Sequence, residues 1–142
     1  MSWKRALLPV VCGILTVAIA GPSPAEEKPE EVAAGRAEAW LALVDVGDYG
    51  QSWEDAAKIF KQAVTKDQWT AAGKAAREPL GKLKSRKSKS RQYTRTLPGA
   101  PEGEYVVIQY DSSFESKVEA VETIIPMKDP DGTWRVSGYF IK

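Results

Sequence analysis

The residues of this chain that could do chemistry are mostly charged side chains gathered in one short segment. The segment KLKSRKSKSR runs from Lys82 to Arg91, and between Pro79 and Pro101 the chain carries seven basic residues and no acidic one. A run of this kind can hold a polyanion through salt-sensitive contacts. The candidate binding residues are its cations: Lys84, Arg86, Lys87, Lys89 and Arg91.

Several interpretations of the basic segment are open. It is typical of a long or bulged β-strand, and lysines on an edge strand discourage pairing with other sheets without any ligand. It can instead bind an acidic envelope protein or another polyanion. We expect no nucleic acid, because the rest of the chain balances the charge and no aromatic residue is interleaved with the basic residues before Tyr93 to stack on bases. Replacement of four of these cations by serine is expected to leave folding largely intact, since exposed charges contribute little to stability. The four are Lys84, Arg86, Lys87 and Lys89.

A second group of residues could line a pocket between a sheet and helices: Tyr110, Glu122, Arg135 and Tyr139. Glu122 lies in a strand-like segment, where it could pair across the sheet with Arg86 or Arg135. We favour this structural ion pair over a catalytic role. The rival hypothesis is an enzyme, or a small-ligand site, that uses Asp48 or Glu122 as an acid or base.

The composition leaves little scope for nucleophilic, redox or metal chemistry. The chain has no histidine, and its one cysteine, Cys12, lies in an apolar segment near the start. Without these residues, Ser-His-Asp and Cys-His machinery, zinc sites of the usual ligand types, c-type haem attachment and thiol redox chemistry are excluded. We therefore expect no metal, no cofactor and a non-catalytic role.

The start of the chain is typical of a secretory signal peptide. Two basic residues in MSWKR precede a largely apolar run of about fifteen residues, which is short for a membrane span. Small residues at positions 23 and 25 favour cleavage near Ala25, although positions 18 and 20 offer a second site. We expect residues 1–25 to be removed, leaving a single domain, residues 26–142, in the periplasm or outside the cell, with membrane contact only during export. An uncleaved anchor is the alternative.

Hydrophobic spacing predicts three helices in the first half of this domain. They fall within the segments 30–50, 52–64 and 65–81. Ser52 with Asp55 and Thr65 with Gln68 are the candidate N-terminal caps of the second and third helices. Gly73 weakens the third helix and indicates a close approach by a neighbouring element. One large aromatic residue per helix is expected to anchor the core: Trp40, Trp53 and Trp69.

Period-two alternation then replaces the helical spacing. Segments rich in Val, Ile, Tyr and Trp predict antiparallel strands at 104–110, 117–125 and 133–141, and the basic segment supplies a fourth. One face of the sheet is expected to carry the apolar residues: Val106, Ile108, Tyr110, Val118, Ala120, Trp134, Val136 and Phe140. This pattern predicts an α+β domain, with about three N-terminal helices packed on a single antiparallel sheet of about four strands.

Several motifs occur in the order found in a known family. They are LVDVGDYGQSWEDAAKIFK, REPLGKLKSR, LPGAPEGEYVVIQYDSSF, VETI and DGTWRVSGYFIK, with Trp69 between the first two, and they span nearly all of the chain after residue 25. On these motifs the chain resembles the DUF4019 family, bacterial envelope proteins of unknown function. The resemblance implies an exported α+β domain with no assigned activity. The expected arrangement is also similar to cystatin-like and NTF2-like folds, an analogy that fixes no function.

Overall fold

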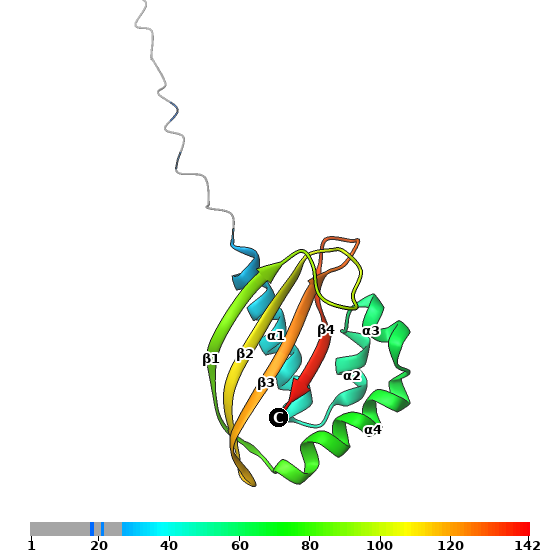
Figure 1. Ribbon diagram of the computed structural model, residues 1–142, viewed down its shortest axis with the longest axis vertical. Helices are drawn as coiled ribbons and strands as arrows, with labels where there is room; N and C mark the ends of the chain where they lie inside the picture. Colours follow the sequence, from blue (N-terminus) through cyan, green and yellow to red (C-terminus); the bar gives the residue numbers. More distant parts are fainter. Residues whose placement is uncertain (1–17, 19–20, 22–26) are drawn as a thin grey trace, which may run out of the picture.

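The structure, a computed structural model, describes Ala18, Gly21 and residues 27–142, so the predicted signal peptide lies outside the described residues apart from Ala18 and Gly21. Helices precede a four-stranded antiparallel sheet, which confirms the predicted α+β class (Figure 1). In chain order the elements are α1 (Pro29–Asp45), α2 (Tyr49–Glu54), α3 (Lys58–Ala63), α4 (Lys66–Arg77), the 3-10 helix η1 (Glu78–Leu80), β1 (Leu83–Thr94), β2 (Tyr105–Phe114), β3 (Lys117–Lys128) and β4 (Trp134–Ile141). Among the described residues, no helix combines the length and apolar character that crossing a membrane requires.

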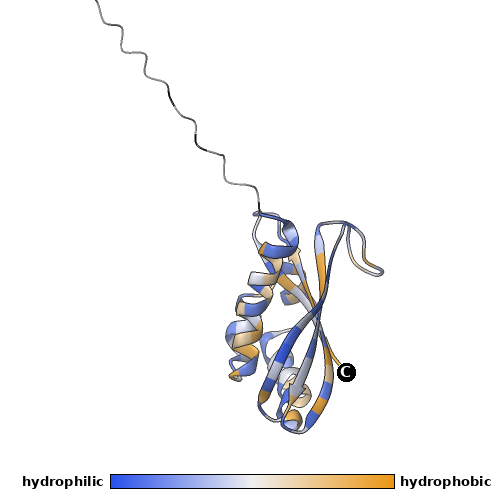
Figure 2. Ribbon diagram, turned by 90° about the vertical axis from the view of Figure 1, so that its left-hand side faces the viewer, coloured by the Kyte–Doolittle hydropathy of each residue, from blue (hydrophilic) through white to orange (hydrophobic). Residues whose placement is uncertain are grey.

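The sheet is a meander in which each strand pairs with the next, so β1 and β4 form its two edges. Helix α1 crosses one face, here called the inner face, while α2, α3 and α4 lie mainly on the β4 side (Figures 1 and 2). The segment 95–104, between β1 and β2, closes one end of the opposite, outer face, where Tyr105 and Met127 pack with Leu97 and Ala100. The main core therefore lies between the helices and the inner face.

The first and last α-helices form largely as the sequence indicates. Helix α4 begins with the predicted capping box, in which the Thr65 hydroxyl accepts from the Gln68 N–H and the Gln68 side chain accepts from the Thr65 N–H. The predicted close approach at Gly73 is also confirmed, because a Cβ at this position would lie 2.6 Å from the ring of Tyr49. Gly73 therefore lets α2 and α4 pack directly against each other.

The predicted continuous helix over 52–64 is wrong. The chain forms two short helices, α2 and α3. Ala57, the residue directly before α3, is extended and donates its N–H to the Val136 carbonyl at 2.8 Å. This bond to the β4 edge competes with helix continuation. Ser52 is not a helix cap either, since Asp48 caps α2 and the Ser52 hydroxyl donates to the Tyr49 carbonyl.

The expected apolar face of the sheet is confirmed at six of its eight positions and wrong at two. Val118 and Phe140 are 74% and 63% exposed. The register of β3 and β4 shifts between Ile125 and Pro126, and one extra residue in a strand moves every later side chain to the other face. Tyr139 therefore faces inward instead of Phe140. Val118 similarly lies past a register shift between β2 and β3.

Aromatic rings fill the space between the helices and the inner face. The ring of Trp40 lies 5.6 Å from Trp69, 5.5 Å from Tyr139 and 6.3 Å from Phe60, measured between centroids. Trp40 and Trp69 are buried, as predicted. Trp53 is only partly buried at the edge of this cluster, where its indole N–H donates to the Val64 carbonyl. Trp53 therefore contributes less to the core than the other two rings.

Candidate functional site

The basic segment forms β1, a long edge strand with two irregularities, as predicted. The register against β2 shifts at Lys84 and again at Lys89. The exposed cations of the strand are Lys84, Lys87, Lys89 and Arg91. Within the described residues, their one ion pair is a loose contact of 3.8 Å between Lys89 and Asp111, both of them well exposed. These four side chains are therefore accessible to a partner and weakly committed to the domain itself.

Arg86 does not belong with these cations, so its grouping with an exposed basic surface is corrected. Because side chains alternate across a strand, Arg86, opposite Ser112, points to the inner face. Its guanidinium bonds to the buried Glu122 and to Asp45 at the end of α1, and its own side chain is only 14% exposed. Replacement of Arg86 by serine is consequently no longer expected to leave folding intact.

Glu122 lies at the centre of a buried polar network and is fully inaccessible to solvent. Its carboxylate accepts from Arg86 Nε at 2.8 Å, Arg86 Nη2 at 3.2 Å, Ser112 Oγ at 2.5 Å and the Tyr139 hydroxyl. The predicted ion pair with Arg86 is therefore confirmed, and Arg135 is not involved. Four donors on one carboxylate leave it little capacity to accept a proton from a substrate.

Asp45 and Arg77 extend the network from the sheet to the helices. Asp45, at the end of α1, accepts two bonds from Arg86, at 2.8 and 2.9 Å, and one from Arg77 Nη2 at 2.7 Å. The Arg77 guanidinium also lies over the ring of Phe114, 4.8 Å from its centroid. Two arginines and two carboxylates thus neutralise one another where α1 and α4 meet the sheet.

The surroundings fix the protonation states of this network. Burial alone would raise the pKa of Asp45, but the hydrogen bonds from Arg86 and Arg77 outweigh it and hold that pKa below its ordinary value. Burial would lower the pKa of Arg86, yet its bonds to Asp45 and Glu122 raise it. Burial and then the nearby Glu122 charge raise the pKa of Tyr139. Tyr139 therefore stays protonated, and its hydroxyl donates a hydrogen bond to the Glu122 carboxylate.

Sequence reasoning missed Asp45 and Arg77 as partners of this network. The two residues lie 32 positions apart along the chain, on different helices. One signal was present in the sequence. Trp69, Gly73 and Arg77 follow at intervals of four, and these are the buried positions of α4. A charged residue that continues a buried helical stripe predicts a buried ion pair.

The predicted pocket is only partly assembled. Tyr110 lies directly opposite Glu122 across β2 and β3, and Tyr139 bonds to Glu122. The Tyr110 hydroxyl is buried, however, and has no hydrogen-bond partner among the described residues. Arg135 lies apart from the other three, beside the turn between β3 and β4. Packed side chains occupy the interior around Tyr110, Glu122 and Tyr139. None of these three residues lines a surface cleft among those that the structure shows.

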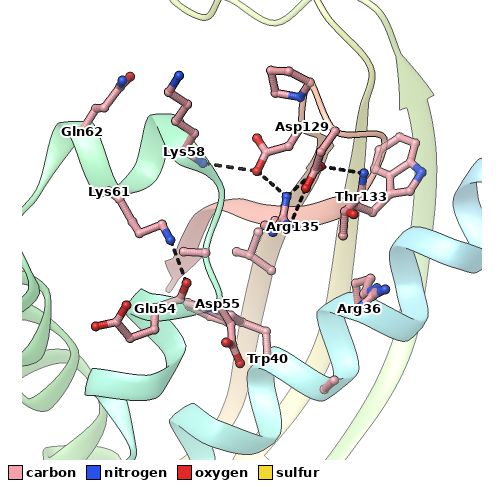
Figure 3. A pocket seen from close by; sticks show the side chains of 16 residues that line it. Arg36, Trp40, Glu54, Asp55, Lys58, Lys61, Gln62, Asp129, Thr133 and Arg135 are labelled. Atoms are coloured by element: carbon pink, nitrogen blue, oxygen red, sulfur yellow. Dashed lines mark hydrogen bonds and ion pairs between the residues drawn. The ribbon is translucent and has the colours of Figure 1, made fainter.

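Two clefts open on the surface instead. The larger, about 960 Å³, lies among α1, the segment between α2 and α3, α3 itself and β4 (Figure 3). In it Arg135 bonds to Asp129 at 2.9 Å and to Asp131 at 2.8 Å. The smaller, about 470 Å³, is lined largely by residues of the outer face, including Lys87, Asp111 and Glu119. Within residues 27–142, histidine, cysteine, aspartate and glutamate form no group of three or more suited to a metal ion.

An exposed basic edge strand, a buried charge network and an antiparallel sheet covered by helices on one face define an α+β domain. The chain matches the model of the family described as Protein of unknown function (DUF4019) over residues 36–139, and it belongs to that family. The match includes the network and β1. A comparison with curated proteins gives no match. The likeness to cystatin-like and NTF2-like folds stays an analogy.

Proposed function

We propose that the chain is an exported, non-catalytic binding domain of the bacterial envelope, which holds an acidic partner through the exposed cations of β1. The observation that carries this proposal is the contrast along β1 between Arg86, which is paired in the interior, and the exposed Lys84, Lys87, Lys89 and Arg91. Export to the periplasm or the medium, with cleavage near Ala25, is proposed on the N-terminal pattern alone.

The environment of the candidate acids supports binding rather than catalysis. Glu122 is inaccessible and accepts four hydrogen bonds, so a substrate could not reach it without disrupting the core. Asp48, the other candidate acid or base, accepts the Gln51 N–H and caps α2. Glu122 therefore has a structural role as an ion-pair partner, and Asp48 has one as a helix cap.

The electrostatics of β1 support a partner that is acidic and held in a salt-dependent way. The exposed cations lie along one strand edge, and the carboxylates nearest in the register, such as Asp111, neutralise them only weakly. Contacts between exposed charges weaken beyond a screening length of about 10 Å at 0.1 M salt. We expect complementary charge to contribute more to association rate and specificity than to affinity.

The test is capture from envelope extract with residues 26–142 at low and high salt. A variant with Lys84, Lys87 and Lys89 replaced by serine leaves Arg86 in place. The matched control replaces three other exposed lysines, Lys28, Lys74 and Lys128, and removes the same charge. We expect the natural domain and the control to retain a partner at low salt, and the β1 variant to lose it. Equal retention by all three proteins would reject the proposal.

A further inference from the structure

The larger cleft lies at the opposite edge of the sheet from β1 and has the form of a binding site. Its volume of about 960 Å³ is at the upper end of the roughly 300–1,000 Å³ typical of small-molecule sites. Its buried lining includes Trp40, Trp134 and Val136, and charged residues come from three different elements. Figure 3 shows Arg36 on α1 and Lys58 on α3 on opposite sides, with Asp129 between them at the top of the view.

Two of the cations that line this cleft are available to a ligand. Arg36 and Lys58 are exposed, and neither side chain has an ion pair within the described residues. Of the acidic residues in the lining, Glu54 and Asp131 are paired with Lys66 and Arg135, whereas Asp55, in the described part of the chain, accepts only from the Gln51 side chain. Two cations on facing walls of one cleft are suited to carboxylates of a bound ligand.

Asp129, in contrast, is suited to a hydrogen-bond donor or a cation of the ligand. It is only 7% exposed, and its Oδ2 accepts from the Lys58 main-chain N–H at 3.4 Å and from Arg135 Nη1 at 2.9 Å. Its other oxygen, Oδ1, is buried and has no partner among the described residues. A buried carboxylate oxygen without a donor is costly, so a donor, preferably a cation, would be favourable beside Asp129.

The edge of β4 adds main-chain groups to the same cleft. The Val136 carbonyl accepts the Ala57 N–H, so the main chain of Val136 faces away from β3. Because antiparallel pairing alternates every residue, the N–H and C=O of Trp134 also face away from β3, and Trp134 lines the cleft. The Thr133 carbonyl accepts the Asp129 N–H, as this alternation requires. An extended ligand with its own amide groups can pair with Trp134.

We propose that this cleft binds a short acidic peptide with free ends. Its ammonium group lies beside Asp129, its terminal carboxylate beside Arg36, an acidic side chain beside Lys58, and its main chain along Trp134. Peptides are the chemical class that combines a cationic end, carboxylates and amides that pair with a strand edge. This site is independent of the partner proposed for β1.

The test uses the tripeptide Ala-Glu-Ala in three forms: with free ends, with the amino end acetylated, and with the carboxyl end amidated. Calorimetry of residues 26–142 gives the dissociation constants, and NMR shifts of the amides of Trp134 and Asp129 give the location. We expect the free peptide to bind at least about tenfold more tightly than either blocked form, because each block removes one charge-assisted contact. Equal binding of the three forms, or no binding up to about 10 mM, a very weak affinity, would overturn the proposal.

Variants assign the two ends of the peptide. In Asp129→Asn we expect the acetylated peptide to bind as tightly as the free peptide. In Arg36→Gln we expect the same of the amidated peptide. Arg36 is exposed and has no ion pair in the described part of the chain, so its variant tests the site even if Asp129→Asn fails to fold. Lys87→Ser is the matched control and should bind the free peptide like the natural domain. Shifts confined to β1, or the same losses in Lys87→Ser, would contradict a site at the β4 edge. Failure of this test leaves the capture by β1 unaffected, and the reverse also holds.

Discussion

Arg86 and Arg135 are each held between two carboxylates, but in very different settings. Arg86 joins Asp45 and Glu122, which are 41 and 36 residues away along the chain. Arg135 joins Asp129 and Asp131, only 6 and 4 residues away, within one hairpin. The Arg86 side chain is 14% exposed and the Arg135 side chain 30%. An arginine between two carboxylates thus connects elements that are distant in the sequence in one place, and stabilises a local turn in the other.

Burial decides what each unit can do. Removing ions from water is expensive, and a buried pair is useful only when every member is satisfied. Glu122 meets this condition with four hydrogen bonds, so its network is committed to holding α1 against β1 and β3. Asp129 does not meet it, because one of its oxygens lacks a partner among the described residues, and Arg77 does not meet it fully, because its Nε and Nη1 lack one too. The Asp129 cluster lines the large cleft, and the network around Glu122 does not.

The largest expected effect follows removal of the central cation. Arg86→Met leaves Glu122 buried and Asp45 with one partner fewer, and we expect a loss of roughly 3–5 kcal/mol in the free energy of unfolding. Chemical denaturation with matched fluorescence and circular dichroism transitions measures it. The double variant Arg86→Met, Glu122→Leu should recover a large part of the loss, because no unpaired charge remains at position 122. A loss below about 1 kcal/mol in the single variant would mean that the network is not structural.

The next effect distinguishes two tyrosines of the inner face. Tyr139→Phe removes a donor to buried Glu122 and is expected to cost roughly 2–3 kcal/mol, as for a hydrogen bond to a charged group. Tyr110→Phe removes a hydroxyl that has no partner among the described residues, so it is expected to change stability by less than about 0.5 kcal/mol or to increase it. Denaturation of both variants checks this, and similar losses would show that Tyr110 also has a partner.

Arg135→Met is expected to cost less than either change in the inner network. Arg135 is partly exposed and Asp131 is 54% exposed, so we expect a loss of about 1 kcal/mol, most of it from the buried Asp129. Thermal unfolding beside Arg86→Met compares the two arginines directly. Equal losses in the two variants would remove the distinction between a structural network and an accessible cluster.

Much of the fold could be predicted because its signals are local. The capping box at Thr65 and the edge-strand character of β1 each depend on a few neighbouring residues. A glycine inside a helical pattern, as at Gly73, is likewise a local sign that another element packs closely there. The pair of Glu122 with Arg86 was also predictable as one of two candidates, because alternation limits which side chains meet across a sheet.

The errors arose where distant residues overrule local pattern. The break before α3 depends on a hydrogen bond from Ala57 to Val136, and the exposure of Phe140 depends on a register shift between β3 and β4. Neither this hydrogen bond nor this register shift can be recognised from the spacing of hydrophobic residues in the sequence. The large cleft was missed for the same reason, since Arg36, Lys58 and Asp129 come together only after α1, α3 and the last hairpin have packed.

The smallest expected difference concerns pH and salt. The pKa values of Asp45 and Asp131 are both lowered from 3.8: at Asp45 the hydrogen bonds from Arg86 and Arg77 outweigh burial, and at Asp131 the main cause is the hydrogen bond from Arg135. A lowered carboxyl pKa stabilises the folded state above its ordinary value, and this stability is lost as the pH falls through the lowered value. Both residues therefore contribute to acid sensitivity below about pH 4.

Salt should separate these two contributions. We expect Asp45→Asn and Asp131→Asn each to flatten the fall in unfolding free energy between about pH 5 and pH 2.5 at low ionic strength. In about 0.5 M salt, screening should suppress the effect of the exposed Asp131, while the network around Asp45 should keep most of its effect. If both effects vanish together, Asp45 is as accessible to solvent as Asp131. The inner network would then differ from the cleft in its geometry but not in its dielectric surroundings.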